Sequence, residues 1–386
     1  MKSVNHINEL LLEATRLQPN VSKLNKLISK VEDYKALQNY SFLHGVLPLV
    51  YKSLKHPDVK IDKDVLLAFK QKFISISQKN MQMTAELITL TKLFKEHKIK
   101  MLPFKGPTLS QLLYNDINSR QYGDLDILVN EESLCEAQEL MSQHNYKMEL
   151  PKKFLKNRLF LKVGKDIHMH NSTSANLVEL HWKLFETKFV FNKKDFSNQS
   201  QTVLVNNTPI ETLKNENLLL YLCLHGSKHF WERLEWIVDI DRLINVAKNL
   251  DLKEIEEQAI KMKSKRLFYL GLSVSHAMFY TPLPLDIKKA IEEDKIVQEM
   301  TKKIAANFSK NNIGKKSTEP FNLDEIKNVS AFTQKNKDTL KSRFIYYFSL
   351  KTGDILMVNL PSYLSWFYHI LRPFRLVGKY LKHIFS

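Results

Sequence analysis

The stretch from Met101 to Val129 constrains this chain most, because it places two carboxylates on one face of a predicted strand. A short apolar run is broken by Lys105-Gly106-Pro107, and apolar residues at helical spacing then predict a helix over Thr108–Tyr114. A polar loop follows, and D-L-D-I-L-V predicts a strand. Side chains alternate between the two faces of a strand, so Asp124 and Asp126 lie on one face, about 7 Å apart.

This pair of carboxylates and the turn before it suit a nucleotide with its metal ion. Adjacent carboxylates repel each other unless a cation lies between them, and a hard ion such as Mg²⁺ binds carboxylate oxygen and keeps positions for phosphate. Gly106 opens a helix whose first N–H groups can hold an anion. The stretch predicts a nucleoside triphosphate (NTP) bound with Mg²⁺ or Mn²⁺. A solvated strand end is the alternative, because D-x-D is a common pattern.

A third carboxylate comes from the predicted strand LVELHW, which ends at Trp182. Leu177, Glu179 and His181 share one face of this strand, and the other face is apolar and suits a core. Glu179 can therefore complete a cluster with Asp124 and Asp126. The alternative is an exposed glutamate on an edge strand.

A basic group of residues lies in the predicted helix LLLYLCLHGSKHFWERL. His225 and His229 are four residues apart and share a helical face, and Lys228 lies beside them. Such a cluster can hold a triphosphate, with Lys as a point charge and His as a donor. Two alternatives remain: a helix that simply packs against the sheet, and a zinc site, although no H-E-x-x-H pattern and no nearby pair of cysteines is present.

The order of these motifs resembles the polymerase-β-like nucleotidyltransferase superfamily, and more closely the bacterial family of uncharacterised nucleotidyltransferases. The resemblance runs from about His44 to Asp239. At the turn, the superfamily usually has Gly-Ser where this chain has Lys-Gly, and the family commonly has Asp where this chain has Glu179. The positions that match the family pattern are Lys105, Gly106, Leu109, Tyr114, Arg120, Asp124, Asp126, Leu128, Val129, His225, Lys228, His229, Trp231, Leu234, Trp236 and Asp239.

The resemblance implies an α+β fold, with a small mixed sheet enclosed by N-terminal and C-terminal helices. It also implies a reaction in which an acceptor attacks the α-phosphate of an NTP and pyrophosphate leaves. Asp124, Asp126 and Glu179 would hold the metal ions, and Glu179 would help to deprotonate the acceptor. The acceptor is left open between an RNA end, a protein side chain and a small molecule. The residues expected at the phosphates are Lys105, Gly106, Arg120, His225, Lys228 and His229.

Charge and cysteine content narrow the range of partners. The chain has 386 residues, 58 Lys plus Arg against 41 Asp plus Glu, and a formal net charge of +17. This excess suits nucleotides, RNA or an anionic membrane, or equally a Lys-rich surface that serves solubility. The two cysteines, Cys135 and Cys223, form no motif and predict a reducing cytoplasm. The amphipathic N-terminus carries acidic residues and does not resemble a signal peptide.

Five regions are expected along the chain: helices over 1–98, the nucleotidyltransferase core over 99–210, a helical domain over 211–309, a linker over 310–338 and C-terminal helices over 339–386. Strands are expected at Tyr146–Leu150, Arg158–Val163, Ile167–His170 and Leu177–Trp182.

The C-terminal segment Leu371–Phe385 predicts a basic amphipathic helix with an apolar face. Its cations are Arg372, Arg375, Lys379 and Lys382. The helix can dock on the protein, which we prefer, or lie weakly on an anionic membrane.

Two other functions remain as alternatives to the enzyme. One is a catalytically silent protein that binds a nucleotide or RNA in a regulatory role, and the other is a membrane-surface scaffold. The intact carboxylates Asp124, Asp126 and Glu179 argue against the silent protein.

Overall fold

The computed structural model describes residues 2–185, 199–247, 249–309, 350–358, 360 and 364–384. The linker expected over 310–338 lies outside the described residues, as does Phe385. Side chains of the last part of the C-terminal helix, from residue 376 onward, are outside the description as well.

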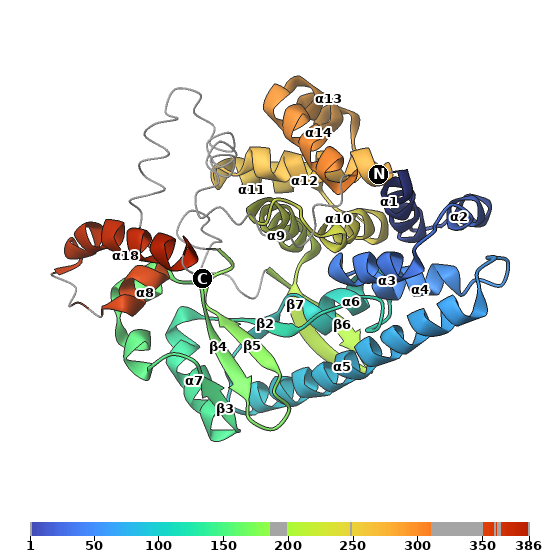
Figure 1. Cartoon of the computed structure of the whole chain (residues 1–386). Coiled ribbons are helices and arrows are strands. Elements are labelled where there is room, and N and C mark those ends of the chain that lie inside the picture. The colour runs from blue at the N-terminus through green and yellow to red at the C-terminus, as the bar shows by residue number, and fades with distance from the viewer. Residues whose placement is uncertain are drawn as a thin grey trace.

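A mixed sheet forms the centre of the described structure, which confirms the predicted α+β fold (Figure 1). Its order is β1-β2-β5-β4-β3. Strands β2 and β5 are parallel, and the other neighbouring pairs are antiparallel. The strands are β1 (Met101–Pro103), β2 (Asp124–Val129), β3 (Tyr146–Met148), β4 (Asp166–Asn171) and β5 (Leu177–His181).

A separate hairpin, β6 (Ser200–Val205) and β7 (Thr208–Leu213), lies beside the sheet. The Thr212 hydroxyl donates a 2.6 Å hydrogen bond to the Pro103 carbonyl, which joins the hairpin to β1. The sequence analysis did not predict these two strands.

Helices surround the sheet. Those that come before β5 in the chain are α1 (Lys2–Ala14), α2 (Val21–Ile28), α3 (Tyr34–Leu43), α4 (Leu47–Leu54), α5 (Lys63–Glu96), α6 (Gly106–Tyr114), α7 (Leu134–Gln143) and α8 (Arg158–Val163), with short 3₁₀ turns η1 (Glu131–Ser133) and η2 (Lys152–Lys156). Those that follow it are α9 (Asn215–Lys228), α10 (Leu234–Val246), α11 (Leu252–Lys261), α12 (Lys265–Phe279), α13 (Leu285–Glu293), α14 (Lys295–Ser309), α17 (Thr352–Met357) and α18 (Phe367–Ile384).

The two faces of the sheet belong to two hydrophobic cores. On β2, Leu125, Ile127 and Val129 enter one core together with α7 and the second half of α5. Leu128, on the opposite face with the two aspartates, enters the other core. This second group of residues joins the N-terminal helices α1–α4 to α9–α14. Strand alternation therefore places the carboxylates on the side of the sheet that α9 and α10 cover (Figure 1).

One predicted strand is wrong: Arg158–Val163 is helix α8. Its alternating apolar residues resemble a strand, but the Asn157 side chain accepts hydrogen bonds from the N–H groups of Leu159 and Phe160 and caps a helix. Phe160 and Val163, three residues apart, are the buried residues of this helix. Some of the apolar residues that suggested a strand therefore also fit the spacing of one helical turn.

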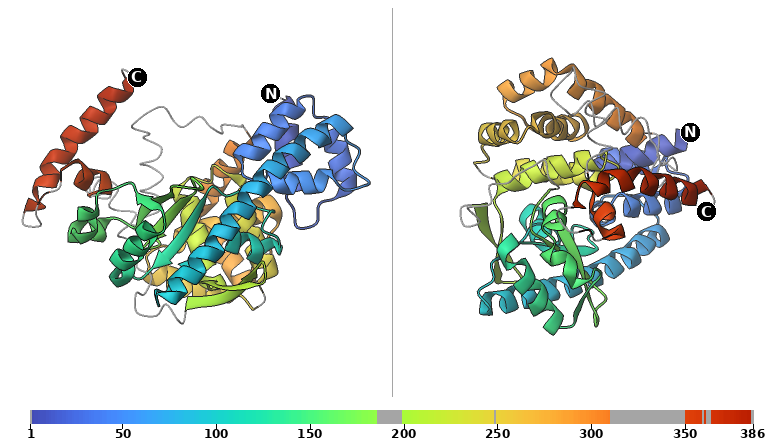
Figure 2. Two further views of the ribbon diagram at one scale, coloured as in Figure 1. Left: turned by 90° about the horizontal axis from the view of Figure 1, so that it is seen from below. Right: turned by 90° about the vertical axis from the view of Figure 1, so that its left-hand side faces the viewer.

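The C-terminal helix α18 lies on the side of the molecule opposite the N-terminal helices (Figures 1 and 2). It docks through Tyr368, which is 0% exposed, and through Arg372, which is buried and pairs with Asp354 of α17. Arg372, which the sequence analysis counts among the cations of this helix, is therefore turned towards a buried carboxylate.

The outer side of α18 is apolar where its side chains are described. Phe374 is 71% exposed, and Trp366 is 57% exposed just before the helix. Among the described residues, no helix has both the length and the apolar character that crossing a bilayer requires.

Candidate functional site

The register of β2 and β5 brings two of the predicted carboxylates together. Asp126 pairs directly with Glu179, and Asp124 pairs with Leu177. Because the two strands are parallel and in register, paired residues point to the same face, as the alternation in both segments led us to expect. The next strand, β4, adds His168 opposite Glu179 and Asp166 opposite His181.

Asp126 lies at the centre of this face and is 2% exposed. Its Oδ1 is 3.3 Å from Lys105 Nζ and 3.2 Å from His181 Nε2. Burial alone would raise the pKa of Asp126, but the Lys105 ammonium and the hydrogen bond with His181 outweigh it and hold the pKa well below its usual value. Asp126 is therefore an ionised carboxylate at neutral pH.

Asp124 is on the same face but stands apart from the others. The donor atoms of Asp126, Glu179 and His181 all lie within 4.8 Å of one another, and Asp124 is not in that set. Burial and the neighbouring charge of Asp126 raise the pKa of Asp124 to about 6, against the opposing effect of Lys105. The structure therefore brings together two of the three predicted metal ligands, and Asp124 keeps a nearby but separate position.

The sequence analysis did not include His181 among the site residues. The imidazole is 1% exposed, and its Nε2 lies 3.3 Å from Glu179 Oε2 as well as 3.2 Å from Asp126 Oδ1. Its hydrogen bond lowers the pKa of Glu179. Alternation in L-V-E-L-H already placed His181 on the same face as Glu179, so the signal was present.

Strand β4 contributes more polar groups that were missed. Asp166, His168 and Glu179 form a second set of donor atoms within 4.8 Å of one another. The period-two spacing of Asp166 and His168 in D-I-H-M-H was the available signal. Lys165 contacts Asp166, and its Nζ is 4.0 Å from Glu179 Oε2. Burial and Lys228 lower the pKa of Lys165 to about 8, which Glu179 partly opposes.

The Lys105-Gly106 turn forms as predicted at the start of α6. Gly106 has φ of +57°, a left-handed conformation that favours glycine. Lys105 directs its ammonium into the site, 3.3 Å from Asp126 and 5.3 Å from the centre of the Tyr221 ring. Burial would lower the pKa of Lys105, but Asp126 and Tyr221 raise it, so this lysine stays charged.

The end of α9 brings the predicted basic residues towards the same face. His225 is half-buried, stacks on Tyr221 and lies 4.7 Å from the His229 ring, whereas Lys228 and His229 are exposed. Desolvation and the positive charges of Lys228, Lys105 and Lys165 lower the pKa of His229 to about 4. The lysines at the end of α9, just before α6 and just before β4 thus influence the same imidazole, as expected if the end of α9 lies near the carboxylates.

The side chain of Arg120 forms a buried ion pair with Asp239 of α10. Its Nε donates 2.9 and 3.0 Å hydrogen bonds to the two Asp239 oxygens, and Nη2 is 2.8 Å from Oδ2. The side chains are 7% and 0% exposed. This buried pair joins the loop after α6 to α10, and the Tyr114 hydroxyl adds a 3.4 Å contact to Asp239. The structure therefore shows Arg120 as a support between two elements.

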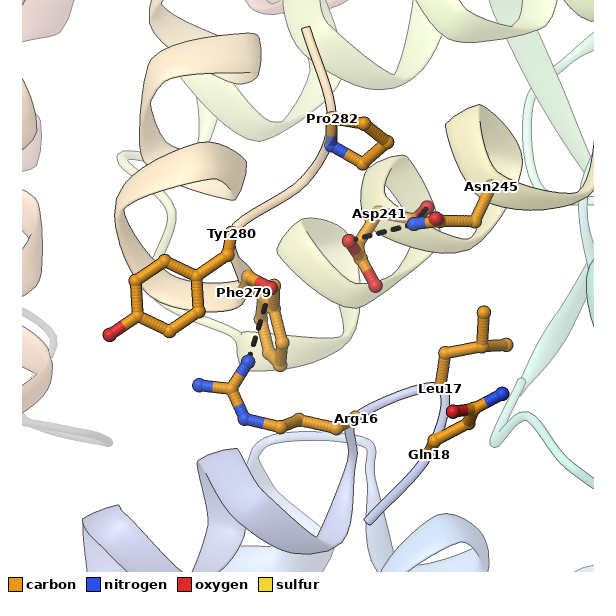
Figure 3. A pocket seen from close by; sticks show the side chains of 8 residues that line it. All are labelled: Arg16, Leu17, Gln18, Asp241, Asn245, Phe279, Tyr280 and Pro282. Atoms are coloured by element: carbon orange, nitrogen blue, oxygen red, sulfur yellow. Dashed lines mark hydrogen bonds between the residues drawn. The ribbon is translucent and has the colours of Figure 1, made fainter. Parts of the chain in front are cut away.

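A small pocket of about 180 Å³ lies away from these residues, between the end of α1 and helices α10 and α12 (Figure 3). Arg16 reaches across it and donates a 3.1 Å hydrogen bond to the Phe279 carbonyl, and Asp241 and Asn245 face it from α10. None of the predicted site residues lines this pocket.

Three solved structures are similar to the chain at a low level. The crystal structure of the lincosamide antibiotic adenylyltransferase LnuA with lincomycin bound has 16% identity and a TM-score of 0.31, and the match covers 42% of this chain and 97% of that one. The solution structure of the antibiotic-resistance factor ANT(2'')-Ia has 9% identity and a TM-score of 0.36, with 51% and 98% covered. The crystal structure of an antigenic nucleotidyltransferase-like protein from Paracoccidioides brasiliensis has 15% identity and a TM-score of 0.32, with 51% and 92% covered.

No curated protein matches the chain. The sequence profile of the family described as "Uncharacterised nucleotidyltransferase" does match it, over residues 30–280. The match spans β1, the strands β2 and β5 that carry the carboxylates, and α9 with its basic residues. It covers well over half of the 386 residues. The chain therefore belongs to the family of uncharacterised nucleotidyltransferases and is an enzyme of that class.

Proposed function

We propose that the protein transfers a nucleoside monophosphate from an NTP to an acceptor hydroxyl or phosphate at the face formed by Asp126 and Glu179. The observation that carries this proposal is the direct pairing of the two residues across parallel strands, with Lys105 beside Asp126 and Lys165 beside Glu179. In the reaction, an acceptor oxygen forms a bond to the α-phosphorus. The bond from that phosphorus to the oxygen bridging the β-phosphate breaks, and pyrophosphate leaves.

The residues present fit a divalent metal ion. Asp126 Oδ2 is a buried polar atom with no hydrogen-bond partner in the described structure, and carboxylate oxygens are common ligands of Mg²⁺ and Mn²⁺. Asp126 and Glu179 would hold the ion, and Asp124 lies on the same face of β2 outside this set of donor atoms. A divalent ion such as Mg²⁺ or Mn²⁺ supplies Lewis-acid stabilisation of the phosphate oxygens and of the leaving group.

The chain's own residues have distinct tasks in this proposal. Glu179 is ionised, since the His181 hydrogen bond lowers its pKa, and it takes the proton of an acceptor hydroxyl. Lys105 and Lys228 place positive charge next to the phosphates, and Gly106 lets the backbone turn there. We assign His225 and His229 to the wall of the phosphate site. Arg120 keeps α6 and α10 in place through Asp239 rather than binding phosphate.

The acceptor is proposed only as a class. An RNA end suits the net charge of +17, and a protein side chain or a small molecule suits the same chemistry. A reducing compartment such as the cytoplasm suits the two free cysteines, Cys135 and Cys223. Weak contact between α18 and anionic lipid is a separate proposal, which the transfer reaction does not require.

Nucleotide binding tests this function. In calorimetry with each NTP, binding should require Mg²⁺ or Mn²⁺, and Asp126→Asn should weaken it by about tenfold or more, because removing one charge from a metal site costs at least ~1.4 kcal/mol. Asp58→Asn is the matched control, since Asp58 is 79% exposed, and it should leave binding unchanged. Binding of equal strength with and without metal would contradict the proposal.

A further inference from the structure

The imidazole of His181 has the position of a metal ligand. Its Nε2 is 3.2 Å from Asp126 Oδ1 and 3.3 Å from Glu179 Oε2. Two ligands that lie about 2.1 Å from one ion, at octahedral or tetrahedral angles, are about 3.0–3.4 Å apart. Both measured distances fall in this range, so one ion can contact the imidazole and both carboxylates after only small shifts.

Asp126 and His181 each keep one buried polar atom that has no hydrogen-bond partner in the described structure. Lys105 and His181 both meet Asp126 at Oδ1, and the other oxygen, Oδ2, is buried without a partner. His181 Nδ1 is also buried without a partner. Buried polar atoms without partners are rare in proteins because each one costs about 1–3 kcal/mol. Of these two atoms, Asp126 Oδ2 belongs to a carboxylate that Nε2 contacts, and a metal ion there would supply its missing partner, whereas Nδ1 lies on the other side of the ring.

The surroundings of the second ring nitrogen match those of metal-bound histidines. A ligand histidine usually turns its other nitrogen towards a carboxylate, which fixes the orientation of the ring. His181 Nδ1 is 3.8 Å from Asp166 Oδ2, which lies on the neighbouring strand β4. The edge of the ring also packs against Phe104, with the centroids 5.1 Å apart. The ring is therefore held with Nε2 directed at the two carboxylates.

We propose that His181 is a direct ligand of the metal ion, so that the ligand set is two carboxylates and one imidazole, and that the site consequently prefers Mn²⁺ to Mg²⁺. Mg²⁺ prefers oxygen ligands, whereas divalent transition metals accept imidazole more readily, and Mn²⁺ is the one among them that also suits carboxylate and water ligands. The proposal rests on the metal site of the proposed function, but it concerns which atoms bind the metal and not whether a nucleotide is transferred.

Mn²⁺ itself is the probe in the test, with the full chain and without nucleotide. Electron paramagnetic resonance counts bound Mn²⁺ in a titration, and electron spin echo modulation detects nitrogen bound directly to it. The wild-type protein should show ¹⁴N coupling. His181→Gln should lose this coupling and weaken Mn²⁺ binding by about tenfold or more, since even the loss of an outer partner of a ligand has such an effect. Mg²⁺, used as a competitor, should be affected less, so the preference for Mn²⁺ should shrink.

His170→Gln is the matched control. His170 lies on β4, on the same face of the sheet, but it is 44% exposed and contacts Glu149. This variant should keep both the ¹⁴N coupling and the Mn²⁺ affinity. If His181→Gln does not fold, as judged by its melting curve, His168→Gln decides: retained ¹⁴N coupling supports His181, and lost coupling assigns the nitrogen to His168 and overturns the proposal.

The outcomes separate this proposal from the proposed function. Bound Mn²⁺ without ¹⁴N coupling in the wild type, or with unchanged coupling in His181→Gln, would overturn the assignment of His181 and leave the transfer reaction standing. Failure to bind Mn²⁺ both with and without an NTP would contradict both proposals.

Discussion

The candidate site depends on a balance of charges among a few residues. The ionised Asp126 is 2% exposed, and it is tolerated because Lys105 and His181 contact it directly. The same contacts keep Lys105 charged in a mostly buried position. Buried charges of opposite sign stabilise one another. Removing one of them leaves its partners buried without a counter-charge, which destabilises the folded protein by their uncompensated desolvation free energy.

The buried pair of Arg120 and Asp239 allows a test of this principle outside the candidate metal ligands. Asp239→Asn should lower the free energy of unfolding by about 3–5 kcal/mol, because it leaves the Arg120 charge buried and unpaired. Glu139→Gln is the control: Glu139 pairs with Lys152 at 2.8 Å on the surface, where the side chains are 56% and 58% exposed, and the change should cost less than about 1 kcal/mol. Urea denaturation measures both. Equal costs for the two variants would show that Arg120 is adequately solvated.

Among the elements, those with strong periodic patterns were predictable from the sequence. The alternation in D-L-D-I-L-V and L-V-E-L-H correctly placed Asp126 and Glu179 on one face, and Asp62 caps the long helix α5 where the apolar pattern begins. The alternation of side chains along a strand does not reveal which strands are neighbours. The pairing of β4 with β5, which places Asp166 and His168 beside Glu179 and His181, could therefore not be predicted from the sequence.

Local competition explains the one strand prediction that is wrong. In α8, an Asn cap outweighed an apolar alternation that spans only six residues. Arg120 matches the family pattern, but its ion pair with Asp239 brings together residues that are distant in the sequence, which no local pattern encodes. His181 was not among the predicted site residues although its face was predicted, because its contacts with Asp126 of the neighbouring strand depend on the pairing of β2 with β5.

Helix α9 should contribute charge to the phosphate site through its last residue. Lys228→Met should weaken ATP binding by about tenfold, which corresponds to one charge-assisted hydrogen bond of ~1.5 kcal/mol. It should leave the weaker binding of AMP unchanged, because only the β- and γ-phosphates are expected near Lys228. Lys152→Met, on an exposed lysine, serves as the control in the same calorimetry. An equal loss for ATP and AMP, or no loss at all, would remove Lys228 from the site.

At the scale of the whole molecule, the sheet separates two cores, and the polar face lies at the boundary of one of them. The N-terminal helices and the helices after the hairpin share this core, although hundreds of residues separate them in the sequence. They therefore support the site from one side, while α7, α8 and α18 pack on the other side of the sheet. This shared core could not be predicted from the sequence, since each amphipathic helix shows that it has a partner but not which one.

The central claim is that this face of the sheet carries out nucleotidyl transfer, and the fate of labelled phosphates tests it most directly. The protein is incubated with Mn²⁺, cell extract and either α-labelled or γ-labelled NTP, and the label on macromolecules and small molecules is measured. We predict that the α-label becomes attached to an acceptor and the γ-label appears in pyrophosphate, and that Glu179→Gln loses the transfer while it keeps most of its NTP binding. Transfer of the γ-label to the acceptor, or undiminished transfer of the α-label by Glu179→Gln, would contradict the account.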